Sequence, residues 1–264
     1  MTDEEILLIG GNVTQVVRIG NTVHRVMGSW SSTVHDLLRY LEARGFNSSP
    51  RMLGIDEQGR EVLTFIEGEV GNYPLPLYMW SDRVLTEAAQ FLRRYHEAVE
   101  GYIPQSGAVW QFEYPDPHLR EVICHNDFAP YNMVFVDQSP RAILDFDIAG
   151  PGPRVWDAAY AAYRFVPLIQ PEDTELQRSG LADPMVQGRR LQLFCDAYGL
   201  ARPREVLEMV EPRLQAMCAT LIGSAAAGNV AFQRMIEEGH LDHYRREIES
   251  FQWYRPRLEQ NLSS

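Results

Sequence analysis

The chain has 264 residues, enough to bury a sizeable core in one large domain or two lobes, and its 45% hydrophobic and 23% charged residues are typical of a soluble globular protein. Its net charge of −12 argues against a nucleic-acid partner, because nucleic-acid phosphates attract basic surfaces. All 24 basic residues are arginines, and the absence of lysine excludes a P-loop and Schiff-base chemistry.

The cysteines and the hydropathy predict a cytoplasmic protein. Cys124, Cys195 and Cys218 form an odd, scattered set without a C-x-x-C pair, which fits a reducing compartment and gives no zinc signature. The first residues are acidic, whereas a signal peptide would be basic. The longest uncharged span, residues 214–233, contains several polar residues, so we expect buried helices there and no membrane segment.

The first 70 residues predict a small α+β lobe. A glycine-containing loop at residues 10–14 precedes two strands, 15–19 and 22–27, joined by a Gly20-Asn21 turn. Such a loop can present backbone N–H groups to phosphates, although a Gly-Gly pair is more often a plain turn. Two further strands, 51–55 and 61–66, follow around a polar turn.

One helix separates the two hairpins. Thr33 and Asp36 have the spacing of a capping box, and Gly45 is a typical helix end. The apolar residues of this helix recur with helical spacing at Val34, Leu37, Leu38 and Leu41. We therefore expect an N-terminal lobe over residues 1–68, with a proline-bearing connector over 71–76.

Residues 69–264 predict a mostly helical lobe. Ser81 can cap a helix over 82–99, on whose apolar face His96 is expected to be a core histidine. Residues 101–120 are irregular and aromatic, and form either a substrate-side loop or a cover over the core. Further helices are expected at 154–166, 186–198, 204–211, 213–238 with a break near 223–228, and 240–260.

The stretch from His125 to Asp157 carries the pattern most informative about function. It reads HNDFAPYNMVFVDQSPRAILDFDIAGPGPRVWD and contains His125, Asp127 and Asn132 in the spacing H-x-D-x-x-x-x-N. An N-capping asparagine and a solvated aspartate would be the plain structural interpretation. The motif residues and Asp145 together favour a functional one.

Two apolar runs, 133–136 and 142–144, flank the polar residues 137–140 and predict a β-hairpin. If the hairpin folds symmetrically about a four-residue loop, Asn132 and Asp145 face each other. Opposed residues in an antiparallel pair have Cβ atoms about 5 Å apart, close enough for two side-chain oxygens to hold Mg²⁺. Asp127, upstream on a loop, remains free to act on another group.

These residues resemble the aminoglycoside phosphotransferase and choline kinase family. The resemblance spans nearly the whole chain and is strongest in CHNDFAPYNMVF and ILDFDIAGPGPRVWDAAY, moderate in VLTFIEGE, and weak in the first 30 residues. It implies an α+β, bilobal protein-kinase-like fold, with a nucleotide-binding lobe over 1–68 and a helical lobe with catalytic loop and acceptor site over 69–264. It also implies a kinase that uses ATP or GTP with Mg²⁺.

The resemblance implies a role for each residue of the catalytic stretch. Asp127 would be the catalytic base, and His125 the structural histidine of the catalytic loop. Asn132 and Asp145 would hold Mg²⁺, and Asp157 would brace the loop through its backbone.

The resemblance also implies a nucleotide-binding set. Asn12 and Thr14 would lie near the phosphates, and the backbone of Phe65 and Glu67 would face adenine. Arg25 stands where such kinases have a lysine that binds phosphates and pairs with a helix glutamate. Arginine can bind phosphate through two hydrogen bonds.

The helix that would carry the partner of Arg25 offers no glutamate at the facing positions. Val34 and His35 stand there, so we expect Arg25 to lack an acidic partner. This departure leaves open a second hypothesis, a catalytically silent nucleotide-binding or regulatory module.

The acceptor is expected to be a small hydroxyl compound. The acidic balance of residues 69–264 is compatible with a cationic acceptor such as an aminoglycoside, a basic peptide antibiotic or an amino alcohol, which associates the chain with antibiotic resistance. Acidic residues of the helical lobe would then form its walls, among them Glu172, Asp173, Glu205 and Glu208.

A haloacid-dehalogenase-type phosphatase is a third hypothesis, because Asp145-Phe146-Asp147 resembles the strand-end D-x-D of that group. Ala149 stands where that group needs Thr or Val, and the usual downstream lysine is absent.

Overall fold

The structure, a computed structural model, describes residues 5–8, 16–168 and 177–262. Its strands are β1 (Glu5–Leu8), β2 (Val16–Ile19), β3 (Thr22–Val26), β4 (Met52–Ile55), β5 (Arg60–Thr64), β6 (Glu69–Val70), β7 (Val122–Cys124), β8 (Met133–Val136), β9 (Ser139–Ile143) and β10 (Gly150–Gly152). Its α-helices are α1 (Ser31–Ala43), α2 (Asp82–Ala98), α3 (Arg154–Phe165), α5 (Pro184–Tyr198), α6 (Pro203–Ala226), α7 (Val230–Glu237) and α8 (His240–Gln260). Three short 3-10 helices are η1 (Leu77–Trp80), η2 (Pro117–Leu119) and η3 (Pro130–Asn132).

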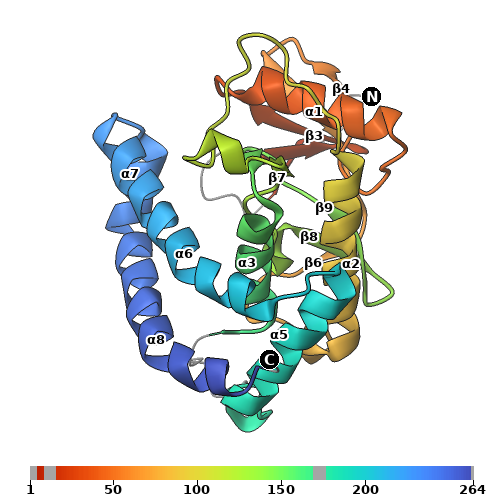
Figure 1. Cartoon of the computed structure of the whole chain (residues 1–264). Helices are drawn as coiled ribbons and strands as arrows, with labels where there is room; N and C mark the ends of the chain where they lie inside the picture. Colours follow the sequence, from red (N-terminus) through yellow and green to blue (C-terminus); the bar gives the residue numbers. More distant parts are fainter. Residues whose placement is uncertain (1–4, 9–15, 169–176, 263–264) are drawn as a thin grey trace.

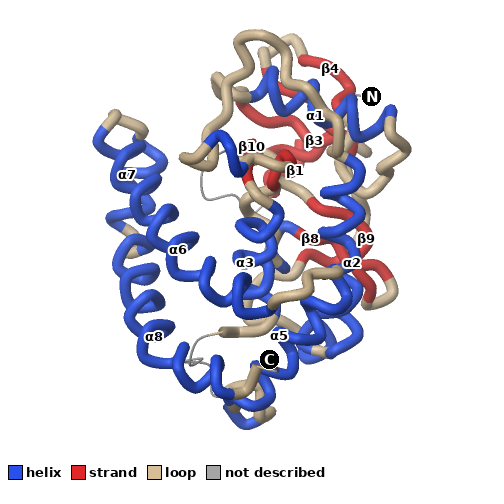
Figure 2. Tube along the Cα trace, viewed as in Figure 1, coloured by secondary structure: helices blue, strands red, loops and turns tan. Residues whose placement is uncertain are grey.

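The described elements form two lobes. The five-stranded sheet with α1 beside it occupies one end of the molecule, and α2, α3 and α5–α8, together with the small sheets β10-β7 and β6-β8-β9, make up the other (Figures 1 and 2). The expected α+β, bilobal arrangement is therefore present. No helix among the described residues has the length and apolar composition needed to cross a bilayer.

The N-terminal lobe is built on an antiparallel sheet of five strands in the order β1-β2-β3-β5-β4. The two predicted hairpins, β2–β3 and β4–β5, are confirmed, and Gly20 adopts the left-handed conformation (φ 56°) that a tight two-residue turn requires. The edge strand β1 was not predicted. The pairing of β3 with β5 brings Arg25 opposite Glu61.

Helix α1 begins two residues earlier than the predicted capping box. It starts at Ser31, whose hydroxyl accepts a hydrogen bond from the N–H of Gly28 at 2.9 Å, so Thr33 lies inside the first turn and its pairing with Asp36 is wrong. The predicted apolar face is correct, because its four members are buried: Val34, Leu37, Leu38 and Leu41.

The helical lobe follows the predicted order with one exception. Ser81 caps α2 by accepting a hydrogen bond from the N–H of Val84 (3.2 Å). The expected interruption between 211 and 213 is wrong, because α6 continues through Pro212 while Val210 and Leu214 pack into the core. The break before α7 is confirmed, and Asn229 caps that helix.

The aromatic segment over residues 101–120 covers the core. Phe112 stacks on Trp156 with ring centroids 5.6 Å apart, and Tyr114 meets the same indole edge-on at 5.0 Å. A Cβ added to Gly150 would lie 1.8 Å from the carbonyl oxygen of Phe112, so only glycine permits this approach. The segment thereby covers β10 and the start of α3, next to the catalytic stretch.

Candidate functional site

The loop between β7 and β8 is anchored by the buried carboxylate of Asp157, in the first turn of α3. Its oxygens accept hydrogen bonds from the backbone N–H groups of His125 (2.7 Å) and Asn126 (2.9 Å) and contact Nε2 of His96 (3.0 Å). Burial opposes the charge, but the hydrogen bonds and the neighbouring histidines hold the pKa of Asp157 below its usual value. His96 also contacts the Tyr198 hydroxyl (2.6 Å), so it is a buried structural histidine.

One cluster near this anchor has metal-ligand residue types. His96, Cys124 and Asp157 could converge on an ion, but Asp157 is engaged by three hydrogen bonds and Cys124 Sγ donates to the carbonyl of Pro153 (3.4 Å). Burial raises the pKa of the Cys124 thiol well above its usual value, which keeps it protonated. The cluster is a structural brace.

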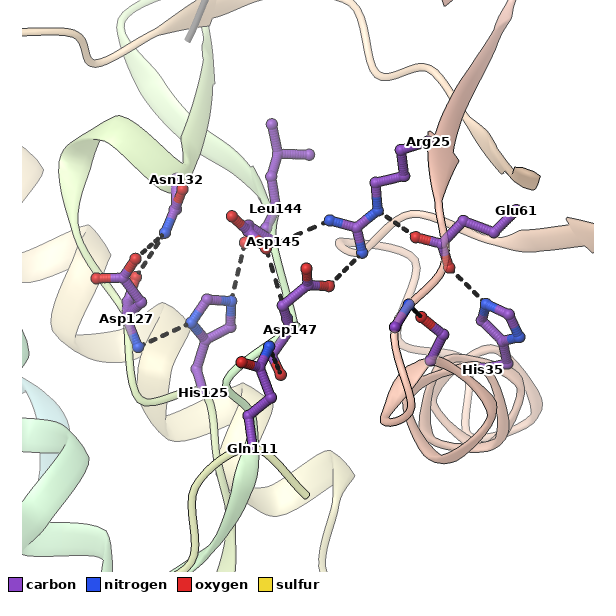
Figure 3. Close-up of polar contacts among 12 residues, drawn as sticks. Arg25, His35, Glu61, Gln111, His125, Asp127, Asn132, Leu144, Asp145 and Asp147 are labelled. Atoms are coloured by element: carbon purple, nitrogen blue, oxygen red, sulfur yellow. Dashed lines mark hydrogen bonds and ion pairs between the residues drawn. The ribbon is translucent and has the colours of Figure 1, made fainter. Parts of the chain in front are cut away.

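His125 fixes the backbone of Asp127, the expected catalytic base. Its ring is fully buried, its Nε2 donates to the carbonyl of Leu144 (2.9 Å), and its Nδ1 accepts the N–H of Asp127 (3.3 Å). Burial lowers the pKa of His125, so the imidazole is neutral. His125 therefore links the Asp127 loop to the strand end that precedes Asp145 (Figure 3).

Asp127 is half-buried, and both carboxylate oxygens are held. The Tyr131 hydroxyl donates to Oδ1 at 2.5 Å, and the Asn132 amide donates to Oδ2 at 2.8 Å. Burial raises the pKa of Asp127, and the hydrogen bond from Tyr131 acts against that shift. The carboxylate is thus fixed in orientation and able to accept a proton.

The hairpin that carries the expected metal ligands differs from the prediction in its turn. Asp137 and Gln138 both have left-handed φ values (51° and 62°), so the turn has two residues, and a bulge follows. As a result the N–H of Leu144 donates to the carbonyl of Asn132 (2.7 Å). The expected face-to-face pairing of Asn132 with Asp145 is wrong by one residue, yet both line the same cavity.

The oxygen donors at this cavity fit a hard divalent cation. The Asn132 Nδ2 is occupied by the carbonyl and carboxylate of Asp127, which leaves the amide Oδ1 for a cation. The side chain of Asp145 is 50% exposed, and among the described residues its Oδ1 has two long contacts, with Arg25 Nη1 (3.4 Å) and with the N–H of Asp147 (3.5 Å). Carboxylate and amide oxygens suit Mg²⁺.

Arg25 lies at the centre of a charged cluster (Figure 3). Its Nε donates to Glu61, its Nη2 lies 2.5 Å from Asp147, and its Nη1 reaches Asp145. The second oxygen of Glu61 bonds to Nε2 of His35 on α1. The expectation that Arg25 lacks an acidic partner is therefore wrong, because β5 supplies the carboxylate that α1 does not.

The cavity has a volume of about 340 Å³ and lies between the five-stranded sheet and the β8–β9 region. Its apolar walls include Val23, Leu63 and Phe146. Arg25, Asn132 and Asp145 gather along its polar side. A flat apolar group and a charged group can therefore bind in one continuous space.

The expected adenine-facing residues lie differently at this cavity. Phe65 lines it and donates its N–H to the carbonyl of Asn21 (2.9 Å), so its carbonyl is the group left for a ligand. Glu67 is not among the lining residues, and its side chain pairs with Arg18 (2.9 Å), whose guanidinium covers the Phe65 ring at 3.7 Å. Asn12 and Thr14 lie outside the described residues.

Sequence patterns did not single out two residues of the site. Glu61 becomes a candidate only when the register between β3 and β5 is known, because that register places it opposite Arg25. Aligning the two predicted hairpins against each other would have been the available signal. Tyr131 follows Asp127 by four residues, and its hydroxyl also contacts that of Tyr160 at 2.8 Å. The position of Tyr131 inside the H-x-D-x-x-x-x-N motif, one residue before Asn132, was the available sequence signal for its contact with Asp127.

Comparisons with known proteins agree with this arrangement. A family model described as "Phosphotransferase enzyme family" matches residues 75–191. The trifolitoxin immunity protein of Rhizobium leguminosarum bv. trifolii is 37% identical over 205 residues, which cover 76% of this chain and 76% of that protein.

Solved structures share the fold at low identity. The amicoumacin kinase hAmiN in complex with AMP-PNP, Ca²⁺ and Ami has a TM-score of 0.64 at 14% identity and covers 93% of this chain and 87% of its own. The gentamicin complex of APH(2")-IIa has a TM-score of 0.59 at 13% identity, covering 94% and 91%. The choline kinase from Cryptosporidium parvum Iowa II has a TM-score of 0.56 at 13% identity, covering 98% and 92%.

Proposed function

The chain belongs to the phosphotransferase enzyme family and has a bilobal protein-kinase-like fold, and from this premise we propose that it transfers the γ-phosphate of ATP or GTP to a hydroxyl of a small antibiotic or toxin. Phosphotransfer to an alcohol group is the activity of the family. The finer assignment of nucleotide, metal and acceptor class is the proposal.

One observation carries it. The guanidinium of Arg25 and the oxygens of Asn132 and Asp145 line a single cavity, and Asp127 is hydrogen-bonded to Asn132 at its edge. Phosphoryl transfer needs charge neutralisation on the phosphate oxygens and an acceptor hydroxyl held in line. The four side chains offer both functions at one place.

At the nucleotide, Arg25 would bind the phosphates and the carbonyl of Phe65 would face the base. Glu61 and His35 hold the guanidinium from β5 and α1, where a kinase ordinarily uses a lysine and a helix glutamate. Asn132 and Asp145 would hold Mg²⁺, which neutralises phosphate charge when bound. Asn12 and Thr14 remain proposed phosphate contacts.

At the acceptor, Asp127 would orient the hydroxyl and take its proton. The O–H bond breaks, the oxygen bonds to the γ-phosphorus, and the bond to the β-phosphate oxygen breaks to release the nucleoside diphosphate. His125 and Asp157 fix the backbone of this loop, and neither exchanges a proton with the acceptor. Tyr131 and Asn132 keep the Asp127 carboxylate in one orientation.

The names of similar proteins support a toxin or antibiotic as acceptor. The 37% identical relative is a trifolitoxin immunity protein, and two structural neighbours are an amicoumacin kinase in complex with Ami and APH(2")-IIa in complex with gentamicin. Phosphorylation of a hydroxyl adds negative charge and bulk to such a compound.

We further propose that the boundary between the two lobes lies between residues 68 and 69, because β6, which begins at Glu69, pairs with β8 of the helical lobe. We also propose that the enzyme works in the cytoplasm, where its nucleotide is available.

The experiment is a transfer screen. Purified protein is incubated with Mg·ATP or Mg·GTP and a panel of hydroxylated antibiotics, peptides and amino alcohols, and each acceptor is examined by mass spectrometry for one added phosphoryl group. A phosphorylated acceptor with matching nucleoside diphosphate release supports the proposal. Nucleotide binding without transfer to any acceptor would instead favour a silent nucleotide-binding module.

A further inference from the structure

Two arginines lie on the acceptor side of the catalytic loop. Arg164, near the end of α3, has its guanidinium 4.9 Å from the ring centroid of Tyr73, 5.1 Å from that of Tyr131 and 5.4 Å from that of Tyr163. It is partly exposed, but its Nε is buried and has no hydrogen-bond partner among the described residues. Its charge is thus surrounded by aromatic faces and not by carboxylates.

The second arginine, Arg213 of α6, is 2% exposed. It donates to the carbonyl of Asn126, in the catalytic loop, and its guanidinium lies 4.7 Å from the ring centroid of Tyr160. Within the described part of the chain neither arginine takes part in an ion pair. Helix α6 packs against both α3 and α8 (Figure 1).

Tyr131 connects these cations to the reacting carboxylate. Its ring is beside Arg164, and its hydroxyl donates to Asp127 (2.5 Å) and contacts that of Tyr160 (2.8 Å). Arg164 is therefore two side-chain contacts away from Asp127. Tyr131, which also lines the cavity, is thus in contact with both Asp127 and the Arg164 guanidinium.

Glu247, an acid on this side, is only partly ionised at neutral pH. Glu247 of α8 acts electrostatically on Tyr73, and burial raises the pKa of Glu247 to about 7. Tyrosine hydroxyl groups and two guanidinium groups thus lie on this side of Asp127, although Asp145 also acts on it electrostatically and the chain as a whole is acidic. A polyamine bound here would face the Arg164 guanidinium, and like charges in a partly buried site repel strongly.

We propose that Arg164 binds a carboxylate of the acceptor, and that the acceptor is a hydroxylated carboxylic acid, such as a peptide with a free C-terminus, and not a polycation. This inference rests on the proposed kinase function. Arginine binds carboxylates through two parallel hydrogen bonds, and a carboxylate would complete a cation that the described residues leave without an anionic partner. The tyrosine rings would cover the non-polar part of the same ligand.

The test uses matched acceptors. Seryl, threonyl and tyrosyl dipeptides are supplied as free acids and as C-terminal amides, beside gentamicin and choline, and kcat and KM are measured for the wild type, Arg164→Gln and Arg164→Lys. Arg257→Gln is the control, because Arg257 also lies over an aromatic ring, that of Trp253 (3.8 Å), away from the site. Calorimetry with Mg·AMP-PNP gives peptide affinity without turnover, and thermal unfolding shows that each variant is folded.

We expect kcat/KM for the free acids to exceed that for their amides by about tenfold or more. A factor of this size corresponds to the free energy of about one hydrogen bond between charged groups. Arg164→Gln should remove that preference mainly through KM, Arg164→Lys should retain part of it, and Arg257→Gln should behave as the wild type. Equal use of acids and amides, or preferred transfer to gentamicin or choline, would overturn the inference and leave the kinase function standing. Absence of transfer to every hydroxyl compound would overturn both.

Discussion

Arg25 and Glu61 are directly opposed in the β3–β5 pair, and the Glu61 carboxylate accepts a hydrogen bond from the Arg25 guanidinium while its other oxygen binds His35. The pair is nearly buried, with 10% of the Arg25 and 2% of the Glu61 side chain exposed. In kinases a lysine–glutamate pair spans a strand and a helix, whereas this arginine–glutamate pair lies within one sheet.

Glu61→Gln should weaken nucleotide binding and lower stability together. The change leaves Arg25 with Asp145 and Asp147 among the described residues, so the guanidinium would be drawn toward Asp147 and toward Asp145, a proposed Mg²⁺ ligand. We expect about a tenfold loss of Mg·ATP affinity by calorimetry and a loss of about 3 kcal/mol in the free energy of unfolding, the order for breaking a buried pair.

The matched control is Glu97→Gln, which removes a carboxylate paired with Arg93 at a position where both side chains are 51% exposed. An exposed pair contributes little, so both quantities should stay close to the wild-type values. Unchanged nucleotide affinity in Glu61→Gln would show that Glu61 does not position Arg25.

Asp145→Ala and Asn132→Ala should weaken nucleotide binding only when divalent cation is present. If the two side chains hold Mg²⁺, each variant should lose about tenfold or more in ATP affinity in Mg²⁺ and change little in EDTA, because the lost contact is to the ion. Equal losses in Mg²⁺ and EDTA would mean that the residues act on the nucleotide or the fold and not on a metal.

Glu247→Gln should change how stability depends on pH. Burial raises the pKa of Glu247 from its ordinary 4.5 to about 7, so the folded chain binds more protons than the unfolded chain between these values. The contribution of Glu247 to the free energy of unfolding is therefore most favourable below about pH 4.5, and it is lost as the pH rises from there through 7.

Because glutamine does not ionise, the free energy of unfolding of Glu247→Gln relative to the wild type should increase from pH 5 to pH 8, by up to about 3 kcal/mol. Chemical denaturation at several pH values without substrate measures the difference. A relative stability that stays constant over this range would mean that the carboxyl group is not desolvated in solution.

Gly150→Ala should be strongly destabilising. The added Cβ would meet the Phe112 carbonyl at 1.8 Å, and a backbone oxygen cannot move aside without shifting the aromatic cover over Trp156. We expect a loss of about 3 kcal/mol or more in chemical denaturation. Gly223→Ala in α6 is the control, since it meets nothing within 4 Å and should be neutral or slightly stabilising. Similar effects of the two substitutions would contradict the close approach.

Local patterns predicted much of the fold and the catalytic stretch. Helical spacing identified the buried face of α1, and the Gly20-Asn21 turn identified the β2–β3 hairpin, because both signals lie within a few residues. The motif spacing likewise singled out Asp127 and Asn132 as candidate site residues, and the structure shows that the two side chains are hydrogen-bonded to each other.

The remaining features depend on geometry that no short pattern carries. The hairpin turn at Asp137-Gln138 uses two left-handed residues without glycine, so the register was misjudged by one. Glu61, the partner of Arg25, is 36 residues away on another strand. Arg164 becomes a candidate binding residue only in the folded chain, where the connector, η3 and α3 place three tyrosine rings around it, those of Tyr73, Tyr131 and Tyr163. Such contacts are set by tertiary packing.

The most direct measurement of the central claim is phosphate transfer by the wild type and Asp127→Asn to the best acceptor of the screen, at saturating Mg·nucleotide. Removal of a general base costs about 10²-fold or more, so kcat should fall by at least that factor while calorimetry gives nucleotide affinity within about twofold of the wild type. Near-normal kcat in a folded Asp127→Asn protein would contradict the assignment of Asp127 as the group that receives the acceptor proton.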